Sequence, residues 1–108
     1  MNRAEKIAKQ NDAFRKTGIG GKTLMTSGVA GLNREIQMEI FRSIQSFSDF
    51  TEANDPHQEH DFGIMEISGR NIYWKIDYYD KNYEYGSEDP TDSSLTNRVI
   101  TIMMADEY

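Results

Sequence analysis

The alternation of apolar and polar residues between residues 62 and 79 constrains the fold of this chain more than any other feature. "FGIMEI" at 62–67 and "IYWKIDYY" at 72–79 are rich in β-branched and aromatic residues, and "SGRN" between them contains a glycine suited to a turn. Successive side chains of a β-strand point to opposite faces, so the second strand has one strongly apolar face. The pattern predicts a β-hairpin whose buried face includes Ile72, Trp74, Ile76 and Tyr78.

Helical periodicity dominates the first half of the chain. Apolar residues recur at helical spacing over residues 3–17, where Gly18 is placed to end a helix, and over residues 34–48, where Asn33 is a good N-cap. The exposed face of the first helix is basic. We therefore predict two amphipathic helices, with the "SGVAG" segment at 27–31 forming a turn before the second.

Two further segments complete the predicted fold. "KTLMT" at 22–26 is a short strand candidate, and "TNRVITIMM" at 96–104 is a final strand, with a short helix as the alternative. A length of 108 residues suits one domain, because domains commonly contain roughly 100–150 residues. We predict an α+β fold in a single domain, residues 1–108, with two helices packed on one face of a small antiparallel β-sheet.

Charge is distributed unevenly along the chain, although the net charge is only −6. Residues 1–48 carry eight Lys or Arg and four Asp or Glu, whereas residues 49–108 carry four and fourteen, which gives +4 and −10. An acidic second half disfavours direct binding to nucleic acid and favours a basic protein partner. The alternative interpretation is that the acidity serves solubility alone.

Composition excludes several classes of protein. The chain contains no cysteine, which excludes disulfides, thiol catalysis and zinc-thiolate sites. No apolar run has membrane-spanning length, and the first residues lack the apolar segment of a secretory signal. We expect a soluble, cytoplasmic protein that does not bind membranes.

Both histidines lie in one short segment, "DPHQEHDFG" at 55–63. His57 and His60, together with Asp61, could provide three ligands for zinc or manganese, and Glu59 could act as a general base. Against a metal site, Pro56 and the non-periodic acidic flank favour a loop whose side chains bind backbone amides. The first interpretation predicts a metal-dependent hydrolase or nuclease, and the second predicts no cofactor.

Tyrosines and carboxylates alternate in the segment "WKIDYYDKNYEYGSEDPTD" at 74–92 and just before it. Tyrosine provides a large contact area at a small entropic cost, and spaced carboxylates can pair with Arg or Lys of a partner. The alternative is that some of these rings only fill the core. The predicted partner-binding surface, called here the tyrosine–carboxylate surface, consists of Tyr73, Asp77, Tyr79, Asp80, Tyr83, Glu84, Tyr85, Glu88 and Asp89.

Several motifs resemble those of the bacterial domain of unknown function 3768 family. They are "NDAFR" at 11–15, "TSGV" at 26–29, "DPHQEHDFG" at 55–63, "WKIDYYD" at 74–80, "YGSEDPTD" at 85–92 and "RVITIMMADEY" at 98–108. The resemblance covers almost the whole chain. It implies a small, single-domain bacterial protein of the kind often carried on plasmids, phages and other mobile DNA, and it implies no activity.

Two functional hypotheses follow. The first is a non-catalytic binding protein that blocks a basic, nucleic-acid-handling host protein, as anti-CRISPR and anti-restriction inhibitors do. It depends on the charge of residues 49–108 and on the tyrosine–carboxylate surface, and only the link to mobile DNA comes from the family resemblance. The second is the metal-dependent hydrolase or nuclease that uses His57, His60 and Asp61. We favour the first.

Overall fold

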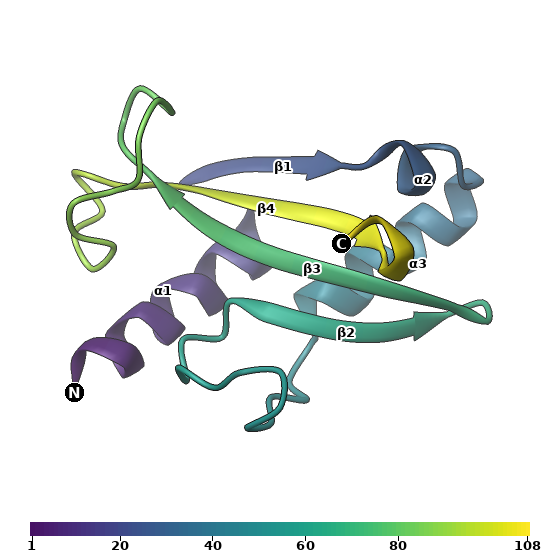
Figure 1. Ribbon diagram of the computed structural model, residues 1–108, viewed down its shortest axis with the longest axis horizontal. Coiled ribbons are helices and arrows are strands. Elements are labelled where there is room, and N and C mark those ends of the chain that lie inside the picture. The colour runs from purple at the N-terminus through teal and green to yellow at the C-terminus, as the bar shows by residue number, and fades with distance from the viewer.

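The computed structural model describes all residues, 1–108, and has an α+β fold, as predicted (Figure 1). No helix in it combines the length and apolar character needed to cross a membrane. In chain order the elements are α1 (Arg3–Thr17), β1 (Gly21–Met25), α2 (Ser27–Ala30), α3 (Arg34–Gln45), β2 (Phe62–Ile67), β3 (Arg70–Tyr79), β4 (Asn97–Met104) and a 3-10 helix, η1 (Ala105–Glu107).

The four strands form one sheet in the order β1-β4-β3-β2. The predicted hairpin is confirmed, because β2 and β3 pair in antiparallel register, and the segment with two alternatives is the strand β4. The sheet is mostly antiparallel, as predicted, because β3 also pairs with β4 in antiparallel register, but it is mixed, since β1 pairs with β4 in parallel. The long segment between β1 and β2, which contains α2 and α3, leaves the direction of β1 free, whereas a short hairpin turn would impose antiparallel pairing.

Side-chain caps fix where the two long helices begin. Asn2 Oδ1 accepts a hydrogen bond from the N–H of Glu5 at the start of α1, and Asn33 Oδ1 accepts one from the N–H of Ile36 at the start of α3. Gly18, at φ 73°, ends α1 in the left-handed conformation that glycine adopts without strain. These caps explain why the two predicted starting points are correct.

The predicted boundaries differ from the structure in two places. Residues 27–31 were expected to form a turn, but α2 covers most of them and places Val29 in the core. The second helix was expected to reach residue 48, whereas α3 ends at Gln45. Phe47 still packs against Trp74, with ring centroids 5.4 Å apart, because the chain after α3 folds back onto the core. Because Phe47 is apolar and packs against the core, the pattern predicted a helix longer than α3.

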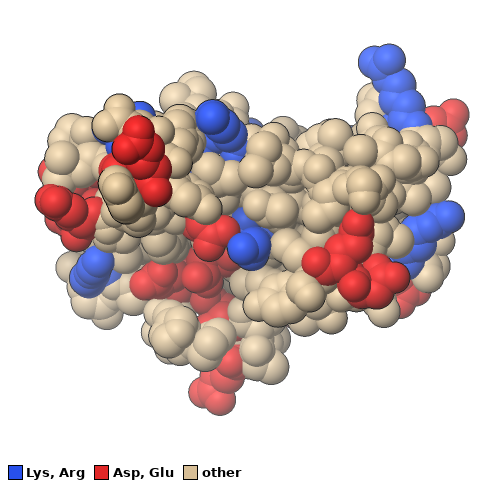
Figure 2. Space-filling view, turned by 45° about the horizontal axis from the view of Figure 1, so that its top comes forward, with Lys and Arg blue, Asp and Glu red and all other residues tan.

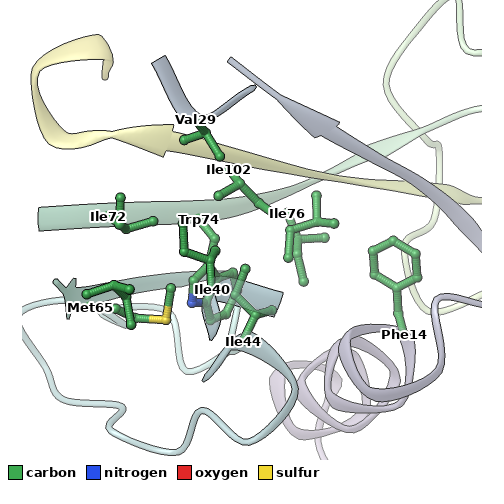
Figure 3. Close-up of a cluster of buried hydrophobic side chains, with 11 residues drawn as sticks. Phe14, Val29, Ile40, Ile44, Met65, Ile72, Trp74, Ile76 and Ile102 are labelled. Carbon is green, nitrogen blue, oxygen red and sulfur yellow. The ribbon is translucent and has the colours of Figure 1, made fainter. Parts of the chain in front are cut away.

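One hydrophobic core joins the helices to the sheet (Figure 3). It contains Phe14 from α1, side chains from α2 and α3, and alternate residues of β2, β3 and β4. Trp74 on β3 is fully buried at its centre. The packing of both helices on a single face of the sheet stays a prediction. The buried residues of the cluster are Phe14, Val29, Ile40, Ile44, Met65, Ile67, Ile72, Trp74, Ile76, Ile100 and Ile102.

Candidate functional site

The loop that carries both histidines is fixed by local hydrogen bonds. The carboxylate of Asp55, which is buried, accepts hydrogen bonds from the N–H groups of Glu59 and His60 at 3.0 and 3.1 Å. The His60 ring stacks on Phe50 with centroids 3.9 Å apart, and its Nδ1 lies 2.9 Å from Oδ1 of Asp12 on α1. His60 is therefore engaged in packing the loop against α1.

The three predicted metal ligands do not form a metal-binding group. No set of three or more His, Asp and Glu side chains in residues 1–108 has a geometry that could hold a metal ion. His57 is exposed, His60 is occupied by Phe50 and Asp12, and Asp61 is partly buried. Burial, followed by the nearby charge of Glu59, raises the pKa of the Asp61 carboxyl. No contact in the structure favours the hydrolase or nuclease alternative.

A buried polar network ties this loop to the sheet and to α1. The fully buried Asn11 donates hydrogen bonds from Nδ2 to the carbonyl oxygen of Glu59 at 3.0 Å and to the Tyr78 hydroxyl at 2.9 Å. Its Oδ1 accepts one from Nε of Arg98 at 2.6 Å. The sequence pattern gave a signal for this role, because Asn11 lies on the apolar stripe of α1 with Ile7 and Phe14. A buried amide needs partners, and here all of them come from distant segments.

Tyr78 and Arg98 complete the network. The Tyr78 hydroxyl donates to Oε1 of Glu59 at 2.9 Å, and Nη2 of Arg98 donates to the carbonyl oxygen of Pro90 at 2.8 Å. Burial raises the pKa of Tyr78 above its ordinary value, so the hydroxyl stays protonated and can donate. The network therefore holds α1, the loop with both histidines, β3, β4 and the loop before β4 in one arrangement. We assign it a structural role.

Arg15 is a buried charged residue on α1. The exposed face of α1 is basic, as predicted, but the Arg15 side chain is only 1% exposed. Its guanidinium lies 5.2 Å from the centre of the Trp74 ring and donates from Nη2 to Asp12 at 2.8 Å. Contact with an aromatic face stabilises a buried guanidinium, which explains its position.

The strand residues of the tyrosine–carboxylate surface lie together. Tyr73, Asp77 and Tyr79 alternate with the buried residues of β3, so they share the face of the sheet opposite the core, called here the outer face. Tyr73 forms an edge-to-face cluster with Phe62 of β2 and with Tyr108. All three strand residues are partly exposed. An aromatic and acidic outer face is therefore accessible from solvent.

The other residues of this surface lie in the loop between β3 and β4, residues 80–96, which extends past the end of the sheet at the left of Figure 1. Asp80 is used within the loop, where Oδ1 accepts hydrogen bonds from the N–H groups of Asn82 and Glu84 at 3.0 and 3.1 Å. Tyr83 also makes a contact within the chain, since Nζ of Lys22 on β1 lies 3.9 Å from its ring centre.

Asp89 has a similar local role. Its Oδ1 accepts hydrogen bonds from the N–H and Oγ1 of Thr91 at 3.0 and 2.7 Å. These bonds, with a smaller contribution from Arg3 and Lys6 of α1, lower the pKa of Asp89. Part of the basic first helix therefore faces this acidic loop within the same chain.

Three residues of the predicted surface remain free for a partner. Glu84, Tyr85 and Glu88 are exposed, and Tyr85 is 71% exposed. None of the four ion pairs in the structure includes them. On the face in Figure 2, acidic and basic side chains are interspersed among wide uncharged areas, and some of them lie next to one another. The loop thus presents an exposed tyrosine between two unpaired carboxylates.

The fold and these contacts define a small α+β protein with a hydrophobic core, a buried polar network beside it and an exposed aromatic–acidic face. The family model described as "Protein of unknown function (DUF3768)" matches residues 25–107, which is most of the chain. The chain therefore belongs to this family, as its motifs predicted. No curated protein and no solved structure matches it.

Proposed function

We propose that this chain is a small, acidic, non-catalytic binding protein of the bacterial cytoplasm that blocks a basic, nucleic-acid-handling host protein. It acts in the manner of anti-CRISPR and anti-restriction inhibitors. The observation that carries the proposal is the exposed Tyr85 between the unpaired carboxylates of Glu84 and Glu88. Tyrosine is enriched among the side chains that dominate protein interfaces, and exposed carboxylates can pair with Arg or Lys of a partner.

Loop rigidity supports the same proposal. The carboxylates of Asp80 and Asp89 hold turns on either side of Tyr85, and the backbone N–H of Asp80 donates to the carbonyl oxygen of Tyr85 at 2.8 Å. A loop that is ordered before binding loses little conformational entropy when it meets a partner. Asp80 and Asp89 therefore keep the loop ordered. This order favours recognition of a partner by the exposed Glu84, Tyr85 and Glu88.

Charge supports a basic partner in particular. The net charge of −10 over residues 49–108 attracts a basic surface and repels the phosphate backbone of nucleic acid. Proteins that bind nucleic acid present such basic surfaces. Occupation of that surface by an acidic protein would prevent nucleic acid from binding, and the mobile DNA implied by the family resemblance gives a reason for such inhibition.

A capture experiment tests the proposal. The tagged full chain is immobilised and exposed to a nuclease-treated bacterial lysate, so that no nucleic acid bridges the proteins. A loop variant, Glu84→Gln/Tyr85→Ala/Glu88→Gln, is compared with the wild type. We expect the wild type to retain a basic protein in stoichiometric amount and the loop variant to lose most of it.

The matched control changes the exposed side of α3 in the same way, as Glu35→Gln/Met38→Ala/Glu39→Gln. It removes the same number of charges and one exposed apolar side chain, so it should retain the partner. Equal recovery by the wild type and both variants would contradict the proposal, because binding would then not depend on the loop.

A further inference from the structure

A cleft of about 430 Å³ lies beside β3, where the loop that carries both histidines, called here the histidine loop, leads into β2. Its lining combines residues of both predicted sites, which the sequence treats as separate. The segment before β2 is fixed there, because the N–H of Ile76 donates to the carbonyl oxygen of Asp61 at 2.8 Å. The side chains that matter for its chemistry are His57, Asp61, Phe62, Lys75, Asp77 and Tyr108.

Two carboxylates in this cleft have capacity to bind a cation. Asp61 takes part in none of the four ion pairs of the chain. Asp77 pairs through Oδ2 with Nζ of Lys75 at 3.0 Å, which leaves Oδ1 outside that pair. Burial and the charge of Glu59 raise the pKa of Asp61, so a bound cation would relieve an unfavourable environment.

Aromatic rings line the same cleft. Phe62 and Tyr108 meet edge to face with centroids 5.7 Å apart, and Tyr73 packs against both rings, at 5.5 and 5.9 Å. Tyr108 is 76% exposed, so its ring is available to a ligand. The faces of aromatic rings attract cations, and the flat, weakly hydrated guanidinium group of arginine stacks on them especially well.

We propose that this cleft receives an arginine side chain of the basic partner, with its guanidinium bound by the carboxylates of Asp61 and Asp77 against the rings of Phe62 and Tyr108. This inference rests on the proposed function and identifies the group that the outer face recognises. Arginine fits better than lysine, because its planar group can bind two carboxylates and stack on a ring together. The Lys75 ammonium competes for Asp77 and sets a limit on the affinity.

A small probe tests the cleft without any knowledge of the partner. Acetyl-arginine amide is titrated into the full chain and followed by backbone amide NMR shifts, with acetyl-lysine amide and the neutral acetyl-citrulline amide as controls. We expect millimolar binding of the arginine probe, with the largest shifts at Asp61, Phe62 and Tyr108. Binding of the arginine probe should be at least about threefold tighter than that of the lysine probe.

Variants separate the contributions within the cleft. Asp61→Asn should weaken binding of the arginine probe about fivefold, and Tyr108→Ala about threefold. Lys75→Gln should strengthen it about twofold, since Asp77 loses its competing partner, and a gain of binding cannot come from misfolding. Asp106→Asn, an exposed change outside the cleft, should leave it unchanged.

The inference is overturned if shifts spread over the acidic surface without a maximum at the cleft. It is also overturned if the three probes bind equally or if Asp61→Asn has no effect on arginine binding. Capture of a basic protein that neither Asp61→Asn nor Tyr108→Ala reduces would contradict the arginine pocket and leave the proposed function standing. Binding of the arginine probe at the cleft without any captured protein would support the pocket and count against the proposed function.

Discussion

Substitution of Asn11 by alanine tests the buried network that holds the histidine loop, β3 and β4 together. The change removes one hydrogen bond from the charged Arg98, at 2.6 Å, and two neutral ones, to the Tyr78 hydroxyl and to the carbonyl oxygen of Glu59. Asn11 is fully buried, so water cannot replace these bonds without opening the structure. The groups left behind would be buried without a partner.

The size of the effect follows from the contacts. A hydrogen bond to a charged group contributes about 1.5–3 kcal/mol and a neutral one about 0.5–1.5 kcal/mol. Tyr78 and Arg98 keep their bonds to Glu59 and Pro90, which limits the loss. We therefore expect Asn11→Ala to lower the free energy of unfolding by about 3–5 kcal/mol. Small domains are stable by only about 5–15 kcal/mol, so this is a large fraction of the total.

Urea unfolding measures this change, followed by the fluorescence of Trp74, the only tryptophan. The midpoint for Asn11→Ala should fall by about 2 M, for a typical urea dependence. The control, Asn82→Ala, removes an exposed amide and should change the free energy of unfolding by less than about 0.5 kcal/mol. A loss below about 1 kcal/mol for Asn11→Ala would refute the reasoning, since the network would then contribute little.

Three further predictions concern stability. Gly63→Ala places a methyl group against the buried indole of Trp74, so we expect a loss of about 1–3 kcal/mol and a shift of its fluorescence, and an unchanged spectrum would contradict this. Asp61→Asn should be more stable than the wild type at pH 7, because burial raises the pKa of Asp61 and disfavours its ionised form. That advantage should shrink as the pH falls through the raised pKa. Glu107→Gln should be less stable than the wild type at pH 7, because a hydrogen bond from Thr26 lowers the pKa of Glu107, and the difference should close on acidification. Urea midpoints measured between pH 3 and pH 7 check the last two, and pH-independent differences would contradict both.

Local patterns in the sequence were sufficient for much of the fold. The period of two between residues 62 and 79 predicted the hairpin, since only one register places Ile72, Trp74 and Ile76 together in the core. Asn33 predicted the start of α3 because its side chain caps the helix locally. The direction of β1 could not be predicted in this way, because its pairing with β4 joins segments more than 70 residues apart.

The candidate sites were predictable only in part. The composition of the tyrosine–carboxylate surface was visible in the sequence, but the contacts that Asp80 and Tyr83 make within the chain depend on loop geometry. The burial of Arg15 and Arg98 depends on partners from distant segments, and charged residues are ordinarily exposed. The cleft could not be predicted, because it brings Asp61 and Asp77 together through the pairing of Asp61 with Ile76.

The central claim is that this chain binds and blocks a basic, nucleic-acid-handling host protein. The most direct test is the plating efficiency of a phage on bacteria that carry one CRISPR or one restriction system and express the wild type, the loop variant or the α3 control. We predict that the wild type and the α3 control raise plating efficiency on at least one defended strain, and that Glu84→Gln/Tyr85→Ala/Glu88→Gln does not. Plating that stays equally low with the folded, expressed wild type on every defended strain would contradict the claim.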